Sequence, residues 1–351
     1  MSKVNVRLCS KCVLNINSEF VPSDESQCLY CKKFNKDEVT SDNKEKQIFQ
    51  SKAIMESTIE KVKTNQDKYY YECLVLLSGG KDSTMALYHM KTRYDLKILA
   101  VTVDNGLIFP TAIENINAAC RILKVDHITY RPYFLGDIYR WVLTNRVPIS
   151  ICRFCNPLNF NTGIQYAKRF NIPLVIHGYS MAQSELMGEN YAVNPLWEEN
   201  ITDILKKLYD DIPETRSIGL TKPEITFLNE NNITLLSPWY YEEYDIGKIR
   251  DFLKEKLDWK DTENSYPKFA TNCMLYSLDT ILLRKYKGYN VVDCEAARLI
   301  RFGNLTRDEA LANLDSDINP SVVQSTLKRL GLTIADIGLT EKELEEYSHF
   351  T

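Results

Sequence analysis

The stretch CLVLLSGGKDSTMAL, residues 73–87, sets an apolar run directly before two glycines and several polar side chains. The apolar residues 73–77 are typical of a strand that is buried on both faces, and the pattern from Thr84 onward predicts a helix. Gly79 and Gly80 let the connecting backbone turn sharply and approach a ligand closely. The amide groups of such a turn, with those at the start of the helix, point toward an anion. The stretch therefore predicts a phosphate-binding site.

The polar side chains of this turn are of the types that hold a nucleotide. A lysine supplies a mobile positive charge, and serines supply hydroxyl groups. The G-x-x-x-x-G-K-[ST] spacing of a Walker A loop does not occur in this stretch, so that class of loop is excluded. Lys81 and Asp82 are the candidate catalytic residues. The candidate nucleotide-binding residues of the turn are Ser78, Gly79, Gly80, Lys81, Asp82 and Ser83.

The sequence S-G-G-K-D-S resembles the signature of the PP-loop ATP pyrophosphatases. This resemblance implies an enzyme that cleaves ATP to AMP and pyrophosphate, with Mg²⁺ neutralising the leaving phosphates. A carbonyl or amide oxygen of the acceptor would attack the α-phosphorus, and sulfide or ammonia would then displace AMP. A protein that senses ATP without chemistry is the non-enzymatic alternative, and an assay for pyrophosphate release separates the two.

Residues 1–36 contain two cysteine pairs, Cys9 with Cys12 and Cys28 with Cys31, in the segments CSKC and CLYC. Thiolates spaced in this way on two short turns form a closed tetrahedral site that suits structural zinc. Too little apolar material lies between the pairs to form a core, so the metal would take the place of one. A closed four-thiolate site leaves no position open for a substrate. The sequence therefore predicts a structural zinc ribbon rather than a catalytic centre.

A second group of cysteines combines the pair Cys152 and Cys155, just before a predicted helix, with the distant Cys273. Cys273 lies in a polar turn that opens a helix, where the helix dipole favours a thiolate. Three thiolates on a cubane 4Fe–4S cluster leave one iron without a protein ligand, and that iron could bind hydrosulfide. The same thiols could instead carry persulfide and disulfide chemistry, or hold zinc or a structural role. The remaining cysteines, expected in the core or uninformative, are Cys73, Cys120 and Cys294.

Two resemblances bear on the second cysteine group. The PP-loop enzymes that thiolate tRNA are similar over about residues 100–350, which implies that Cys152, Cys155 and Cys273 ligate a 4Fe–4S cluster, with Cys273 catalytic. The N-acetyl sugar amidotransferases share the pattern CSKCVLNINSEF…CLYC and the ending GNLTRDEALANL. That second resemblance implies amidation of a sugar with ammonia from a separate glutaminase partner. A cysteine in LDWKDTENSYPKFATNC, where that family is expected to have histidine and aromatic residues, favours sulfur over nitrogen.

Apolar strands alternate with helical stretches from residue 71 to about residue 240. Such alternation predicts an α/β fold with a doubly wound parallel sheet and right-handed crossovers, the PP-loop (HUP-like) architecture. The expected strands are 73–77, 96–104, 127–133, 172–180 and 233–241. The expected units are a zinc ribbon (1–36), a linker and helix (37–70), the PP-loop domain (71–244) and a mostly helical C-terminal region (245–351).

Ligands of such sheets bind beyond the carboxyl ends of the strands, so three loops should meet there. Besides the S-G-G-K-D-S turn, these are VDNG, Val103–Gly106, and HGYS, His177–Ser180. In the PP-loop family the segment that matches VDNG lines the adenosine pocket. The nucleotide-binding residues that the resemblance implies outside the turn are Val103, Asp104, Gly106 and Gly178.

The HGYS segment departs from the family pattern, which is commonly Gly-His followed by acidic residues. The order here is His-Gly, and the usual acids are replaced by residues such as Ser180 and Gln183. Asp82 and Asp104 are therefore the candidate carboxylates for Mg²⁺ or for ordering water. For His177 two interpretations stay open, a catalytic role and a hydrogen-bonded position at the end of a strand.

The composition bounds the location and the partners. The 351 residues carry a net charge of −4 and contain no apolar run as long as a membrane span. The N-terminus lacks the apolar stretch of a signal peptide, so we expect a cytoplasmic protein without a membrane partner. Phosphate contacts to tRNA usually require an excess of Lys and Arg, so a small-molecule acceptor is expected over tRNA. Residues 203–232 are expected to shape the acceptor pocket, and a homodimer is one candidate assembly.

Overall fold

The computed structural model describes residues 6–34, 41–179, 201–217, 220, 225–240, 244–267 and 272–349. Five strands form one parallel sheet in the order β5-β4-β3-β6-β7. They are β3 (Cys73–Leu76), β4 (Ile98–Val103), β5 (Asp126–Tyr130), β6 (Leu174–Ile176) and β7 (Thr234–Leu236). The predicted α/β fold with a parallel sheet is confirmed.

The direction in which strands are added to the sheet reverses at β3. The chain runs outward from β3 to β4 and β5, then returns to add β6 and β7 on the other side of β3. Ligands of open α/β sheets bind at such a switch point, beyond the carboxyl ends of the strands. The S-G-G-K-D-S turn follows β3, and His177 follows β6. The topology therefore brings two of the three predicted loops together.

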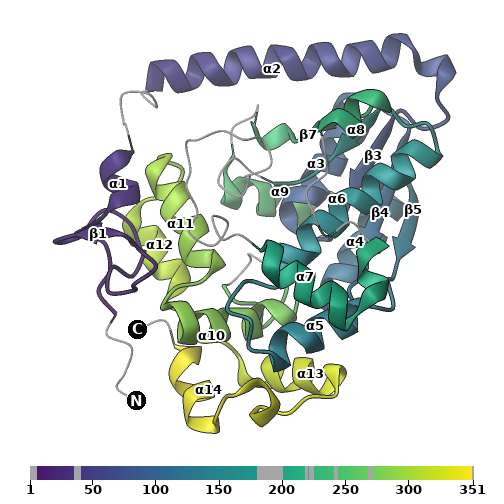
Figure 1. Ribbon diagram of the computed structural model, residues 1–351. Helices are drawn as coiled ribbons and strands as arrows, with labels where there is room; N and C mark the ends of the chain where they lie inside the picture. The colour runs from purple at the N-terminus through teal and green to yellow at the C-terminus, as the bar shows by residue number, and fades with distance from the viewer. Residues whose placement is uncertain are drawn as a thin grey trace.

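Side chains on the central strands alternate between two layers of helices because successive residues of a strand point to opposite faces. Leu74 and Leu99 share an apolar cluster with Ile164 of α6 (Cys152–Arg169) on one face. Val75 and Ala100 belong to a second cluster on the opposite face. The helices of that face are α3 (Lys81–Tyr88), α4 (Pro110–Leu123) and α9 (Ile246–Leu257), with the π-helical turn η3 (His89–Arg93) after α3. Both faces of the sheet are thus covered (Figure 1).

Helix α9 lies after the predicted domain boundary at residue 244 but packs on α3 and α4. Its Leu253 is buried in the apolar cluster of the sheet, together with Trp259. The indole Nε1 of Trp259 donates a hydrogen bond of 3.0 Å to the carbonyl oxygen of Gly79. The chain therefore contacts the glycine turn after β3 as far along as Trp259.

The C-terminal region is helical, as expected. Its helices α10 (Leu275–Lys287) and α11 (Val291–Arg301) lie between the sheet and the N-terminal segment (Figure 1). Helix α11 begins at a capping box in which Asn290 and Asp293 bond each other's backbone amides. The other helices packed in this region are α5 (Leu135–Thr144), α12 (Arg307–Leu314), α13 (Pro320–Leu330), η6 (Ala335–Ile337) and α14 (Glu341–Ser348).

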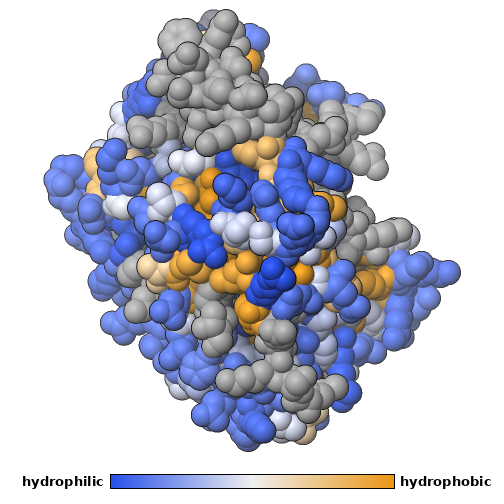
Figure 2. Space-filling model, turned by 90° about the vertical axis from the view of Figure 1, so that its left-hand side faces the viewer, coloured by the Kyte–Doolittle hydropathy of each residue, from blue (hydrophilic) through white to orange (hydrophobic). Residues whose placement is uncertain are grey.

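The N-terminal module, residues 6–34, consists of a short hairpin and one helical turn. Its elements are β1 (Ser23–Asp24), β2 (Gln27–Cys28) and α1 (Leu29–Lys33). The Nδ2 of Asn15 donates to the carbonyl oxygen of Gly288, and the Nε of Arg307 donates to that of Cys12, both at 3.1 Å. The module therefore rests on the C-terminal helices. On this face of the molecule, polar residues surround a central band of apolar side chains (Figure 2).

Helix α2 (Ser41–Thr64) is the helix expected between the zinc ribbon and the sheet. In Figure 1 it runs from the side of the N-terminal module to the side of the sheet. Near its C-terminal end it buries Met55, Ile59 and Val62 in the apolar cluster of the sheet. The 3-10 turn η2 (Gln66–Lys68) leads from it into β3. None of the helices that the structure describes, α2 included, is long and apolar enough to cross a membrane.

Candidate active site

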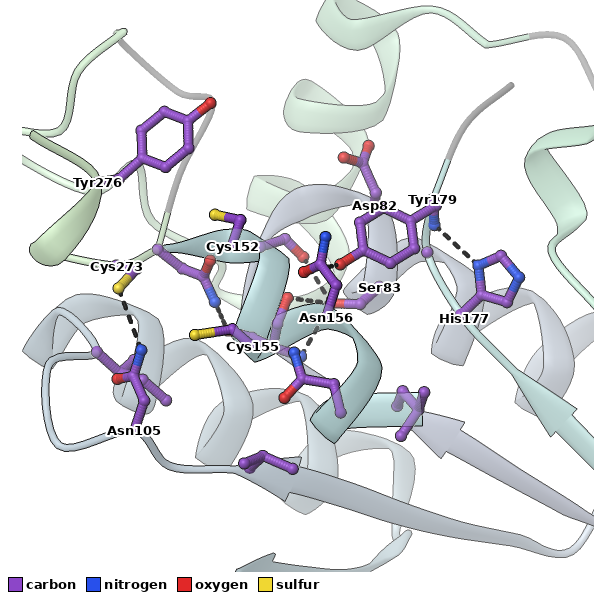
Figure 3. A pocket seen from close by; sticks show the side chains of 18 of the residues that line it. Asp82, Ser83, Asn105, Cys152, Cys155, Asn156, His177, Tyr179, Cys273 and Tyr276 are labelled. Carbon is purple, nitrogen blue, oxygen red and sulfur yellow. Dashed lines mark hydrogen bonds between the residues drawn. The ribbon is translucent and has the colours of Figure 1, made fainter. Parts of the chain in front are cut away.

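A cavity of about 300 Å³ lies at the carboxyl edge of the sheet (Figure 3). The turn after β3 contributes Ser78 and Lys81, the loop after β4 contributes Asn105, and the loop after β6 contributes His177. Helices α6, α10 and α11 supply other parts of the wall. The structure thus brings the three predicted loops to one place.

The turn after β3 has the backbone that an anion site requires. Gly79 has a φ of +77°, and a Cβ there would lie 2.2 Å from the carbonyl oxygen of Ala112, so glycine is the residue that fits. Gly80 is the N-cap of α3, which begins at Lys81 rather than near Thr84 as expected. The first-turn amides of a helix have no acceptor within the helix, and the helix dipole places partial positive charge there. The turn and α3 can together bind phosphate.

Two serines brace this turn from within. The amide of Ser78 donates to Ser83 Oγ at 3.1 Å, and the two hydroxyl oxygens lie 3.0 Å apart. Ser83 Oγ also donates to the carbonyl oxygen of Gly80 at 3.3 Å. Both side chains line the cavity, so they hold the shape of the turn and present hydroxyl groups to a ligand.

Lys81 and Asp82, the candidate catalytic pair, contact each other at the cavity wall. Lys81 Nζ lies 2.9 Å from Asp82 Oδ2, and Tyr244 OH donates to Asp82 Oδ1 at 2.9 Å. Trp239 Nε1 donates to the carbonyl oxygen of Asp82 at 3.2 Å. Burial, with the nearby Asp82 carboxylate adding to it, raises the pKa of Tyr244 well above its usual range. A neutral tyrosine therefore orients Asp82, and Asp82 orients the lysine.

The loop after β4 places its predicted residues differently. Val103 and Asn105 line the cavity, whereas Asp104 and Gly106 are not among its lining residues. Asp104 Oδ1 accepts from the amide of Gly106 at 2.8 Å, and Oδ2 lies 3.7 Å from Arg131 Nε. Asp104 thus shapes its own turn and pairs with a cation at the rim. Of the two carboxylates expected to serve Mg²⁺ or water, the structure places only Asp82 on the wall.

The loop after β6 packs directly on the start of α3. A Cβ on Gly178 would lie 2.6 Å from the backbone nitrogen of Ser83, so this approach requires glycine. Burial lowers the pKa of His177 to about 3, and its Nδ1 accepts from the amide of Tyr179 at 3.3 Å. A neutral, hydrogen-bonded ring fits the interpretation of His177 as a residue at the end of a strand. Ser180 lies outside the described residues.

The second cysteine group lies in the same cavity as the nucleotide-binding turn. Cys152 and Cys155 stand in the first turn of α6 rather than before the helix, because α6 begins at Cys152 and continues through Pro157. Cys273 is held beside the loop after β4 by a backbone bridge to Ile108. Figure 3 shows the three sulfur atoms directed into one shared space. The fold therefore unites the pair with the distant third cysteine.

Hydrogen bonds lower the pKa of these thiols, whereas burial raises it. Asn105 Nδ2 donates to Cys273 Sγ at 3.2 Å, and Tyr139 OH lies 3.0 Å from Cys155 Sγ. Burial nevertheless raises the pKa of all three thiols, that of Cys155 to about 12. For Cys273, burial thus opposes the helix dipole that was expected to favour a thiolate. The thiolate forms need a compensating cation.

The spacing of the sulfur atoms differs between the two cysteine groups. Among the described residues, Cys9, Cys12, Cys28 and Cys31 form the one group of three or more potential ligands whose atoms all lie within 4.8 Å of one another. A single zinc bound tetrahedrally by sulfur requires sulfur atoms about 4 Å apart, since Zn–S is about 2.3 Å. Cys152, Cys155 and Cys273 do not form such a closely spaced group in the described part of the chain.

The N-terminal group is built as a closed metal site. The amides of Lys11 and Cys28 donate to Cys9 Sγ at 3.4 and 3.3 Å. Hydrogen bonding from its neighbours, Cys12 first, lowers the pKa of the Cys9 thiol. Amide donors of this kind stabilise thiolate ligands. The group is compatible with the predicted zinc ribbon.

The described part of segment 203–232 lies away from the cavity. Helix α7 (Thr202–Asp211) packs on α5, where Trp141 Nε1 donates to Asp211 at 2.7 Å. None of the described residues of the segment lines the cavity, and residues 218–219 and 221–224 lie outside the described part, so the expectation that the segment shapes an acceptor pocket stays a prediction. The other elements there are η4 (Pro213–Ser217), α8 (Ile225–Glu230) and, after β7, η5 (Pro238–Tyr240).

Four residues of the site were not among the predicted site residues. Asn105 lies inside the VDNG segment and could have been found there, because its side chain follows a strand. Tyr139, Tyr244 and Asp279 come from helices or connections whose spacing does not point to the site. Only the fold shows that they contact Cys155, Asp82 and the start of α6.

Comparison with protein families gives one match, to queuosine biosynthesis protein QueC over residues 72–153. The matched segment begins just before β3 and ends within the first turn of α6, so it contains the S-G-G-K-D-S turn and VDNG. The uncharacterized protein MJ1599 of Methanocaldococcus jannaschii is 25% identical over 285 residues, which cover 80% of this chain and 86% of that protein.

Two solved structures are also similar. The NH3-dependent NAD synthetase of Campylobacter jejuni is 16% identical with a TM-score of 0.30, and the match covers 59% of this chain and 93% of that one. The NMN synthetase of Francisella tularensis is 17% identical with a TM-score of 0.29, covering 57% and 84%. The family match over residues 72–153, which contain the glycine turn after β3, supports the resemblance of this part of the chain to the PP-loop ATP pyrophosphatases.

Proposed function

We propose that this protein is an ATP-dependent transferase that adenylates an oxygen of its acceptor and replaces that oxygen with sulfur. One observation carries the proposal. Cys152, Cys155 and Cys273, from distant parts of the chain, line the same cavity as the PP-loop residues Lys81 and Asp82. Three partly buried thiols beside the turn that is proposed to bind ATP offer a place to hold sulfur next to the activated acceptor.

The first half of the reaction uses the turn after β3. The amides of the turn and of α3 would hold the β- and γ-phosphates, with Lys81 stabilising the charge that develops on pyrophosphate. Mg²⁺, when bound, neutralises part of that charge. The acceptor oxygen attacks the α-phosphorus, the bond to the bridging oxygen breaks, and pyrophosphate leaves. Asp82, fixed by Tyr244, keeps Lys81 in position.

The second half needs a source of sulfide next to the adenylated acceptor. Sulfide attacks the activated carbon, and AMP leaves with the electron pair of the carbon–oxygen bond. Cys152, Cys155 and Cys273 would hold a 4Fe–4S cluster, which when bound offers one iron without a protein ligand as a site for sulfide. Asn105, which donates to Cys273, and Tyr139, beside Cys155, would stabilise the thiolate forms.

The test is anaerobic purification followed by analysis of iron, sulfide and zinc, with the visible spectrum recorded. We expect about four irons and four sulfides in the wild type. Cys152→Ala, Cys155→Ala and Cys273→Ala should each abolish the iron and leave the zinc unchanged. Cys120→Ala is the matched control, because Cys120 is a buried cysteine outside the cavity. A colourless protein that holds only zinc after reconstitution would overturn the proposal.

A second candidate, an N-acetyl sugar amidotransferase, is favoured by one contact. Arg307 lies in GNLTRDEALANL and donates to the backbone of Cys12 in the N-terminal module. The two segments that carry the resemblance to that family are thus neighbours in space. Mass spectrometry of the product formed with ³⁴S-sulfide or ¹⁵N-ammonium distinguishes the two reactions, and ammonia transfer would further require a glutaminase partner.

We further propose a small-molecule acceptor in preference to tRNA. Helices α10 and α11 contribute Tyr276 and Glu295 to the wall, and the chain carries a net charge of −4. Tight binding to tRNA depends on phosphate contacts and weakens steeply with salt. Binding to bulk tRNA is therefore expected to be weak at physiological salt, and tight, salt-dependent binding would indicate a tRNA acceptor.

A further inference from the structure

The carboxylate of Asp279 is buried at the edge of the cavity in a position that the proposed chemistry leaves unused. Asp279 lies on α10, is 4% exposed, and lines the cavity beside the cysteines. None of the ion pairs found among the described residues includes it. A buried carboxylate without a paired cation is costly unless hydrogen bonds hold it. The hydrogen bonds of Asp279 therefore indicate its role.

Both oxygens of Asp279 contact the residues immediately before Cys152. Ser150 Oγ donates to Oδ2 at 2.7 Å, and the amide of Ile151 donates to Oδ1 at 3.0 Å. The amide of Cys152 in turn donates to Ser150 Oγ at 3.2 Å. One carboxylate thus accepts hydrogen bonds from a hydroxyl group and a backbone amide just before α6, where the first two cysteines lie.

The same carboxylate belongs to the chain segment that carries the third cysteine. Cys273 lies one residue before the N-cap of α10, and Asp279 stands in the first half of that helix. Cys273 itself is tied to the loop after β4, since the amide of Met274 donates to Leu107 O at 2.8 Å. Because α10 is a rigid helix and its N-terminal end is fixed in this way, Asp279 and Cys273 keep a constant position relative to each other.

We propose, resting on the proposed function, that Asp279 is a positioning residue that ties the start of α6 to α10 and so holds Cys152 and Cys155 opposite Cys273. Aspartate suits this task because one carboxylate offers acceptors to a hydroxyl and an amide at once. Asparagine can keep the geometry: its oxygen accepts from the amide of Ile151, while its NH₂ group donates to the Ser150 hydroxyl. Alanine can make neither bond.

The test measures the proximity of the thiols in the reduced full-length protein that keeps the metal of its N-terminal module and has not been reconstituted with iron. Dibromobimane joins neighbouring thiols and becomes fluorescent, and peptide mass spectrometry then identifies the joined pairs. Trypsin cleaves after Arg153, so the peptides with Cys152 and Cys155 separate, and Cys273 lies in a third peptide. The measured quantity is the yield of the pairs that join Cys273 to either of the other two. Iron content after reconstitution is the second readout.

We expect Asp279→Ala to lower the cross-link yield and the iron content by about tenfold, since two hydrogen bonds are lost. Asp279→Asn should stay close to the wild type, and Ser150→Ala should fall between them. The matched control is Asp293→Ala, which removes another buried carboxylate from the neighbouring α11, 5% exposed and bonded to the cap residue Asn290 outside the cavity. That variant should lose stability and keep both the cross-link and the iron.

The outcomes separate this proposal from the proposed function. Normal cross-linking in Asp279→Ala, or equal losses in Asp279→Ala and Asp293→Ala at matched stability, would overturn the positioning role. So would a wild type in which Cys273 joins neither cysteine. A wild type that cross-links, responds to Asp279→Ala and binds no iron would support the positioning role while the cluster fails.

Discussion

The N-terminal cysteines and the cavity cysteines differ in how the chain brings them together. The four N-terminal thiols come from two neighbouring turns of one small module and lie within 4.8 Å of one another. The three cavity thiols come from the start of α6 and from the turn just before α10, and they meet only once the sheet and the C-terminal helices have packed. The first site is local, whereas the second is a product of the whole fold.

This difference determines what each site can contribute to the protein. A local four-thiol site can stabilise a module that has almost no core, since the binding energy of a structural metal is also folding energy. A site assembled by the whole fold cannot direct folding in this way, but it can face a ligand cavity. Changes to the N-terminal site should therefore alter stability, and changes at the cavity should alter chemistry.

The largest expected effect is the loss of one buried N-terminal ligand. If the module holds the expected zinc, Cys12→Ser should release it and lower the free energy of unfolding of the module by more than ~4 kcal/mol, because metal binding and folding are coupled. Limited proteolysis should then cut residues 6–34 while the sheet still binds a non-hydrolysable ATP analogue. Cys73→Ser, in a buried strand outside both groups, is the control for a general loss of core packing. Full metal retention in Cys12→Ser would show that the N-terminal cysteines are not a local metal site on which the folding of the module depends.

The next effect concerns chemistry without a large change in stability. Lys81→Met should lower the rate of pyrophosphate release from ATP by on the order of a hundredfold to a thousandfold, as expected when one electrostatic contact to a transition state is lost. Lys260→Met, an exposed lysine paired with Glu114, should leave the rate unchanged. A Lys81→Met variant with normal turnover and a lowered melting temperature would show that Lys81 has a structural role.

A smaller effect tests the contact between two loops of the cavity. Gly178→Ala would place a Cβ 2.6 Å from the backbone nitrogen of Ser83, so the loop after β6 must move away from α3. We expect affinity for the ATP analogue to fall by about 1–3 kcal/mol, the usual cost of overpacking. Gly247→Ala, whose Cβ would lie 3.5 Å from the nearest atom, is the control. Calorimetric titration measures both, and equal affinities would show that this contact is dispensable.

Local patterns predicted the parts of the molecule that local physics determines. The apolar run into Gly79 and Gly80 predicted a strand, a turn and an anion site, because periodicity and glycine act over a few residues. The spacing of Cys9, Cys12, Cys28 and Cys31 predicted a closed site for the same reason. In the structure the four thiols do converge.

Features that depend on distant segments were predicted less well. Asp104 turns toward Arg131, which follows β5, and no pattern around VDNG reveals that partner. The pair Cys152 and Cys155 falls inside α6 because the helix continues through Pro157. The pKa of Cys273 is raised by burial that only the complete fold produces. The chemistry at the cavity is therefore harder to derive from sequence than the metal site of the module.

The smallest expected effect concerns two arginines that each donate to a backbone carbonyl. One bonds the N-terminal cysteine group, and the other bonds the loop after β4, next to the cavity. Arg307 Nε donates to Cys12 O, and Arg329 NH1 donates to Gly106 O at 3.3 Å. Arg307→Ala should destabilise the module by ~1 kcal/mol and speed the release of zinc to a chromogenic chelator, since one hydrogen bond is lost. Arg329→Ala should leave zinc release unchanged. Equal rates in the two variants would mean that the C-terminal helices do not support the metal site, and that the module stands on its four cysteines alone.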